Sequence, residues 1–92
     1  MAHYLVIASH DPEECLDAIE QTLNQGPGFE EAYKWGCLVG DHTGYVFVRA
    51  SGTDEALSDY VPHFLRDRAV ARRVFRISGR ELLGMREERE RR

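Results

Sequence analysis

Both cysteines of the chain lie five positions from a histidine, in opposite order. His10 precedes Cys15, whereas Cys37 precedes His42. Imidazole nitrogens and thiolates bind zinc, iron and copper, and near neutral pH they also act as bases and nucleophiles. One chemistry that this pattern supports is a divalent transition-metal site of two histidines and one or two thiols. With three ligands and an open position, such a site would activate water or bind a small substrate.

An aspartate adjoins each of these two histidines. Asp11 follows His10, and Asp41 precedes His42. A carboxylate near a metal-binding histidine commonly accepts a hydrogen bond from the ring and fixes its orientation. We therefore expect Asp11 and Asp41 to orient the two imidazoles.

Two interpretations without a metal remain open for the same residues. In one, Cys15 is a nucleophile, with His10 and His42 as further candidates for catalysis. A helix N-terminus would lower the pKa of that thiol, although two neighbouring glutamates oppose the shift. In the other, the residues are structural: if Asp11 caps a helix, His10 and Cys15 take the two positions that pack together at an ordinary helix start. Cys37 is then a small core residue and His42 is solvated.

The first half of the chain predicts the elements that position these residues. Residues 3–9 are rich in β-branched and aromatic side chains, which is typical of a strand. A helix follows, with Asp11 as cap, Pro12 in its first turn and Glu14 completing a capping pattern. The sequence Gly26-Pro27-Gly28 ends that helix. Residues 33–39 and 45–50 read as two strands joined by a turn at 40–44.

The second half of the chain completes the pattern. A helix starts near Glu55 and breaks at Pro62, a strand spans 70–78, and a charged helix starts at Gly79. The resulting βαββαβ order predicts an α+β, ferredoxin-like fold with a four-stranded antiparallel sheet and both helices on one face. We expect a domain over residues 1–78 and a charged helical tail over 79–92.

This topology brings the chemical residues together. The first strand ends at the same edge of the sheet as the turn at 40–44, so His10, Cys15 and His42 should meet there. The alternation along the first strand puts His10 on the same face as Tyr4, and Cys37 joins that face in the preferred hairpin register.

The first and third strands are apolar on both faces, which a half-solvated sheet would not be. We assign Leu5 and Ile7, together with the valines of the third strand, to the face covered by helices. The second face should then pack on a partner sheet. Its expected aromatic residues, which would line a cleft between the two sheets, are Tyr4, Trp35, Tyr45 and Phe47.

The motifs also resemble a family. The segment His10-Asp11-Pro12, the run from Trp35 to Tyr45 (WGCLVGDHTGY) and the later Pro62-His63-Phe64-Leu65 are similar to small bacterial proteins of the dimeric α+β barrel superfamily. The resemblance covers about residues 3–78 and leaves the Arg/Glu tail unmatched. It implies a homodimer whose sheets face each other around a cleft. It fixes no reaction, because the superfamily includes monooxygenases, isomerases and haem-handling proteins, and no catalytic residue set carries over.

Composition restricts the class of protein. The chain has 92 residues, 42% of them hydrophobic, and a net charge of −4, which suits one small globular domain. Residues 1–65 hold eleven acids and two bases, whereas residues 66–92 hold ten arginines and five acids. No motif typical of nucleic-acid-binding domains is present to support nucleic-acid binding. No signal peptide or membrane segment is evident, so we expect a cytoplasmic protein with reduced thiols.

Two functions compete at this point. The first is a homodimer that binds a metal or small molecule at its His/Cys site, with catalysis left open and with zinc, iron or copper as the expected cofactor. The second is a non-catalytic module that associates with itself or with an acidic partner through its open sheet face and arginine-rich last third.

Overall fold

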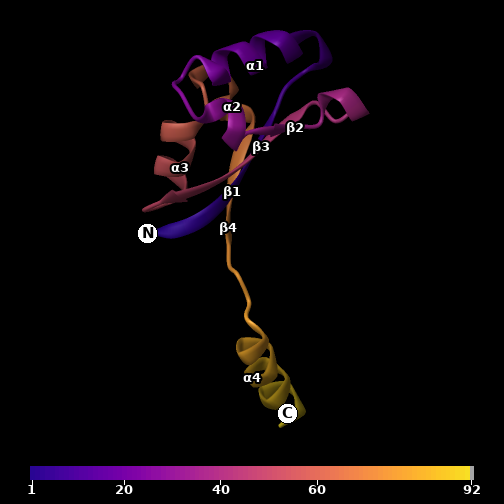
Figure 1. Ribbon diagram of the computed structural model, residues 1–92, viewed down its shortest axis with the longest axis vertical. Helices are drawn as coiled ribbons and strands as arrows, with labels where there is room; N and C mark the ends of the chain where they lie inside the picture. The colour runs from indigo at the N-terminus through magenta and orange to yellow at the C-terminus, as the bar shows by residue number, and fades with distance from the viewer. Residues whose placement is uncertain (92) are drawn as a thin grey trace.

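The computed structural model describes residues 1–91 and has an α+β architecture (Figure 1). Its strands are β1 (Ala2–Ser9), β2 (Lys34–Trp35), β3 (Thr43–Ala50) and β4 (Ala69–Val74). Its α-helices are α1 (Cys15–Leu23), α2 (Phe29–Ala32), α3 (Thr53–Tyr60) and α4 (Gly79–Glu90). Short 3-10 helices cover Pro12–Glu14, Cys37–Val39 and His63–Arg68. The strands form one antiparallel sheet in the order β2-β3-β1-β4, which confirms the expected four-stranded α+β fold.

The core lies between one face of the sheet and helices α1 to α3. The register pairs Tyr4 with Val48 and Val6 with Val46, so these four side chains share that face. All four are buried, and Leu65, which is fully buried, packs against the same cluster. Burial of this apolar face is the main source of stability for a sheet of this size.

The opposite face of the sheet, which we call the open face, is covered by none of the helices in residues 1–91. It carries Leu5 and Ile7 from β1, Tyr45 and Phe47 from β3, and Val70 from β4. The assignment of Leu5 and Ile7 to the helix-covered face is therefore wrong, and so is the assignment of Tyr4 and Trp35 to the open face. Pairing of Trp35 with Gly44, and of Tyr4 with Val48, places both aromatic residues among the core side chains instead.

Two strands are shorter than the sequence predicts. β2 covers two residues rather than 33–39, because Gly36 turns the chain into the 3-10 helix Cys37–Val39. β4 stops at Val74 rather than Ser78, because its partner β1 begins at Ala2 and the last pair is His3 with Val74. Residues 75–78 therefore continue beyond the sheet. The short helix α2 was not expected.

The last helix stands apart from the rest of the molecule. Figure 1 shows α4 at the end of an extended segment that leads away from the sheet, and the molecule measures 52 × 29 × 23 Å. Every residue from Phe75 to Arg91 is exposed. Within residues 1–91 we find no helix with the length and apolar character needed to span a bilayer.

Candidate metal centre

The His/Cys cluster lies at the edge of the sheet where β1 ends and β3 begins. The backbone N–H of His10 donates to the carbonyl of His42 at 3.0 Å, which ties these two segments together. Cys15 is the first residue of α1, and Cys37 is the first residue of the 3-10 helix that follows β2. One ligand atom from each of the four residues lies within 4.8 Å of the other three. The expected convergence is confirmed, and Cys37 is a full member of the group.

The contacts within the cluster are close. Cys37 Sγ is 3.4 Å from His10 Nε2, and the rings of His10 and His42 meet edge to face with centroids 5.9 Å apart. The Sγ atoms of Cys15, at the start of α1, and Cys37, in the turn after β2, lie within 4.8 Å of each other. His10 is 6% exposed, and the other three residues are half-buried. The group is thus shielded by protein yet reachable by a small ion.

Each of the two histidines in the cluster has a buried ring nitrogen without a hydrogen-bond partner. Nδ1 of His10 and Nδ1 of His42 are the two such side-chain atoms among the residues that the structure describes. Leaving a buried polar nitrogen unpaired costs about 1–3 kcal/mol, so native proteins rarely do so without a functional reason. A ligand that engages the two imidazoles would give this arrangement such a reason.

The two aspartates do not orient the imidazoles. Asp41 accepts a hydrogen bond from the Tyr45 hydroxyl, and Asp11 lies 3.9 Å from the guanidinium of Arg68. The carboxylates therefore have other partners, and the Nδ1 atoms that they were expected to engage stay unpaired. The expectation for Asp11 and Asp41 failed because adjacency in sequence does not fix the direction of a side chain in a turn.

Burial sets the protonation states of the cluster. Burial and the neighbouring His42 lower the pKa of His10, which favours the neutral imidazole that binds metals. Burial, helped by the Cys15 thiol, raises the pKa of Cys37 to about 11. Without a metal, Cys37 is therefore a protonated thiol at neutral pH. A bound cation would have to displace that proton.

Sequence reasoning missed the ion pair that supports the cluster. Arg68 donates two hydrogen bonds to the Glu14 carboxylate, at 2.5 and 3.2 Å. These bonds, and one from the backbone N–H of Asp11, lower the pKa of Glu14 to about 2. The pair fixes the turn between His10 and Cys15 against the 3-10 helix His63–Arg68. The capping pattern pointed to Glu14, but no local signal marked Arg68.

Gly36 closes the loop that carries the other two ligands. Its carbonyl accepts from the backbone N–H of Asp41 at 2.9 Å, and its N–H donates to the carbonyl of Thr43 at 3.1 Å. A Cβ at Gly36 would lie 2.7 Å from both the Cβ and the carbonyl oxygen of Asp41. Only glycine lets the two sides of this loop come so close, which sets the positions of Cys37 and His42.

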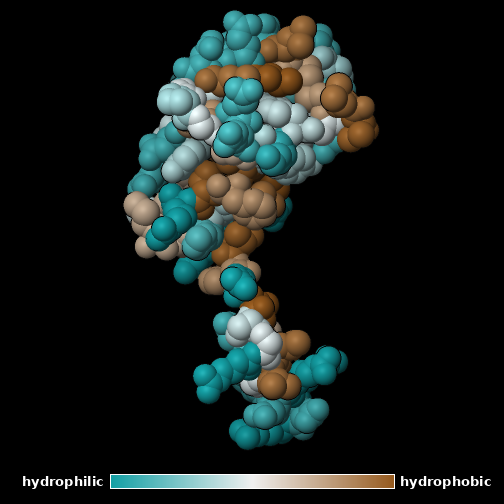
Figure 2. All heavy atoms as spheres, viewed as in Figure 1, coloured by the Kyte–Doolittle hydropathy of each residue, from teal (hydrophilic) through white to brown (hydrophobic). Residues whose placement is uncertain are grey.

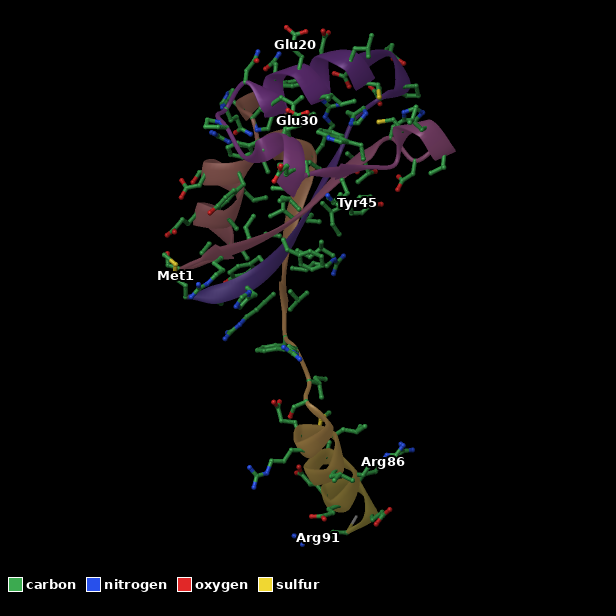
Figure 3. All side chains as sticks on the ribbon, viewed as in Figure 1. Met1, Glu20, Glu30, Tyr45, Arg86 and Arg91 are labelled. Carbon is green, nitrogen blue, oxygen red and sulfur yellow. The ribbon has the colours of Figure 1, made fainter. Side chains whose placement is uncertain are left out.

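An aromatic wall adjoins the cluster on the helix-covered side. The rings of Tyr33 and Trp35 stack with centroids 5.3 Å apart, and Trp35 lies 6.0 Å from the ring of His10. Tyr45, labelled in Figure 3, lies on the other side of the sheet, as does Phe47. The four aromatic residues expected to line one cleft are thus divided between two faces. The cluster does not open onto Tyr45 and Phe47.

Comparison with protein-family models, with curated proteins and with solved structures gives no match for this chain.

Proposed function

We propose that the protein binds a divalent transition metal, with zinc as the best fit, through His10, Cys15, Cys37 and His42. The observation that carries the proposal is the mutual approach of the four ligand atoms within 4.8 Å. Two imidazole nitrogens and two thiolates make up the Cys2His2 set that zinc binds tetrahedrally. Copper(II) prefers a planar arrangement, and iron is the second choice for such a ligand set.

Four protein ligands favour a binding or structural role over catalysis. Catalytic zinc sites keep one position for water or substrate, whereas closed sites of four residues hold the fold together. The four ligands come from four separate segments, so a bound ion would join the end of β1, the start of α1 and both sides of the loop 36–42. A nucleophilic role for Cys15 without metal is the second choice, because burial lowers the pKa of the neighbouring His10, so that imidazole supplies no cation to stabilise a thiolate.

Metal analysis of untagged protein tests this proposal directly. We expect about one zinc per chain after dialysis against trace zinc, and a rise in melting temperature on zinc addition, because the ion binds only the folded state. Cobalt(II) should give thiolate charge-transfer absorption. Cys15→Ser and Cys37→Ser should each lose the metal, whereas His63→Gln, at an exposed histidine outside the cluster, should keep it. If neither the native protein nor the His63→Gln control holds stoichiometric metal, the proposal is refuted.

We also propose self-association through the open face. On this face Phe47 of β3 is 74% exposed and Val70 of β4 is 48% exposed. An apolar sheet face of this kind commonly packs against another sheet. The strand order is consistent with a ferredoxin-like domain, and the resemblance to dimeric α+β barrels implies two such sheets facing each other.

Light scattering on the native chain tests self-association. We expect a dimer that Phe47→Glu converts to a monomer. Leu16→Glu is the matched control, because Leu16 is 81% exposed on α1, on the other side of the sheet. A native monomer at all concentrations, or equal effects of the two variants, would contradict this second proposal without touching the first.

A further inference from the structure

Residues 75–90, which we call the arm, present apolar side chains to solvent. The arm consists of an extended segment, Phe75 to Ser78, followed by α4. Figure 2 shows hydrophobic side chains along it, interrupting the polar surface. Its exposed apolar residues and their exposed fractions are Phe75 (73%), Ile77 (56%), Leu82 (46%), Leu83 (62%) and Met85 (55%).

The arm has little to stabilise it in a single chain. α4 has twelve residues, and isolated helices of that length are marginal in water. Its Ser78 cap accepts a hydrogen bond from the N–H of Glu81 at 3.1 Å, which secures only the first turn. An ordered α4 with three exposed large apolar residues therefore needs a surface to pack on.

The open face has the complementary chemistry. Besides its apolar residues it carries Lys34, Arg49 and Arg72, and none of the strand residues on this face, all within the described chain, is acidic. α4 supplies both the apolar residues and several glutamates, Glu81 and Glu87 among them. A hollow of about 560 Å³ lies on this face at the base of the arm, lined by His3, Phe47, Val74, Phe75 and Arg76. Apolar contact favours α4 against the open face, and the helix, with four glutamates and three arginines, keeps one net negative charge toward this basic face.

The open face of the same chain is not the place where the arm lies. The segment 75–78 continues in the direction of β4 and leads away from the sheet (Figure 1). A second copy of the chain offers the same face without requiring the arm to turn back. Because each copy has one arm and one open face, a twofold arrangement satisfies both at once, as in an isologous dimer.

We propose that the arm of one copy packs along the rim of the open face of a second copy, beside the paired sheets, so that two arms are exchanged in the dimer. This inference rests on the self-association proposed above and is independent of the metal. In such a dimer, α4 covers apolar side chains at the rim of the paired sheets and brings its glutamates toward Arg49 and Arg72 of the other copy.

Photo-crosslinking in the full chain tests the exchange. A photoreactive phenylalanine analogue replaces Leu83, and unlabelled protein is mixed with ¹⁵N-labelled protein before irradiation. We expect crosslinks that join one light and one heavy chain and that map to β1, β3 or β4. Crosslinks within one chain, crosslinks to α1–α3, or none at all would overturn the arm exchange. If the crosslinking fails but light scattering still reports a dimer, only the arm exchange is refuted. If light scattering reports a monomer, both self-association and the arm exchange are refuted.

Two double variants of α4 test the arm exchange without the photoreactive analogue, in case that analogue perturbs packing. Leu82→Gln/Leu83→Gln removes apolar contacts of α4, whereas Arg86→Gln/Arg89→Gln makes the same kind of change at polar positions of the same helix. We expect the first to raise the dimer dissociation constant at least tenfold and the second to change it less than threefold. Zinc stoichiometry should not change in either variant. Equal dissociation constants for the two variants would overturn the exchange.

Discussion

Substitution of Gly36 by alanine should weaken metal binding without touching a ligand. The added Cβ would lie 2.7 Å from both the Cβ and the carbonyl oxygen of Asp41, and one of these is backbone that cannot rotate away. The backbone angles of Gly36, φ −92° and ψ 3°, are accessible to alanine, so the effect is steric and not conformational.

The magnitude follows from how the loop can respond. Overpacking at a tight site costs about 1–3 kcal/mol, which for a domain of this size lowers the melting temperature by roughly 4 °C or more. The loop can relieve the overlap only by moving Gly36 and Asp41 apart, which lengthens the 2.9 Å hydrogen bond between them. Cys37 and His42 adjoin these two residues, so they move relative to His10 and Cys15. Loss of such supporting contacts typically lowers metal affinity about 10- to 100-fold.

The assay is zinc competition against a chromophoric chelator, with thermal unfolding of the same samples. Gly84→Ala is the matched control, because an added Cβ in α4 meets no heavy atom within 4 Å. It should leave zinc affinity unchanged. If Gly36→Ala binds zinc as tightly as the native chain while circular dichroism reports an intact fold, the loop does not position the ligands as argued.

Three further predictions concern stability and thiol reactivity. Glu14→Gln should destabilise the protein at pH 7 in denaturant titrations, and the difference should vanish as pH falls from about 4.5 to about 2. The reason is that the Glu14 pKa is lowered to about 2 by Arg68, so its stabilisation is present above the unfolded pKa and is lost on protonation of the folded state. Leu65→Ala should cost about 2–5 kcal/mol of unfolding free energy, because Leu65 is fully buried in the core. Alkylation of Cys37 in zinc-free folded protein should be slow at pH 7 and accelerate up to about pH 11, as measured by peptide mass spectrometry, because its pKa is raised to about 11. Fast alkylation at pH 7 would show that the pKa of Cys37 is not raised in the folded protein.

The order of the elements and the meeting of the ligands could be predicted because both depend on topology. Once the first strand and the 40–44 turn were placed at one edge of an antiparallel sheet, His10 and His42 had to be neighbours. Their backbones are in fact joined by a 3.0 Å hydrogen bond. Cys15 followed from the helix start at Asp11-Pro12. These inferences needed only strand order, which is insensitive to errors of one residue.

The faces of the sheet could not be predicted in the same way, because strands that are apolar on both sides contain no signal of which side is buried. In β1 the buried set Tyr4, Val6 and Ala8 is no more apolar than the half-buried pair Leu5 and Ile7 on the other face. Packing volume decides instead: small Ala8 and the glycine at position 44 leave room for the ring of Trp35, which lies against Gly44. Arg68 was missed for a related reason, since its bond to Glu14 spans 54 positions of sequence.

The corrected faces change what the cluster can do. Had His10 and Cys37 lined a cleft between two sheets, a metal there would face a substrate cavity, and catalysis would be the natural role. Instead the cluster lies on the helix-covered side, beside the stacked rings of Tyr33 and Trp35, with four ligands available to one ion. The proposed dimer and arm exchange use the open face. The proposed metal site and the proposed dimer interface lie on opposite faces of one sheet. Zinc removal should therefore lower the melting temperature while leaving the dimer dissociation constant within about threefold, provided that the chain stays folded. A dimer that dissociates tenfold more readily on chelation, with unchanged circular dichroism, would show that the two faces are coupled through β1.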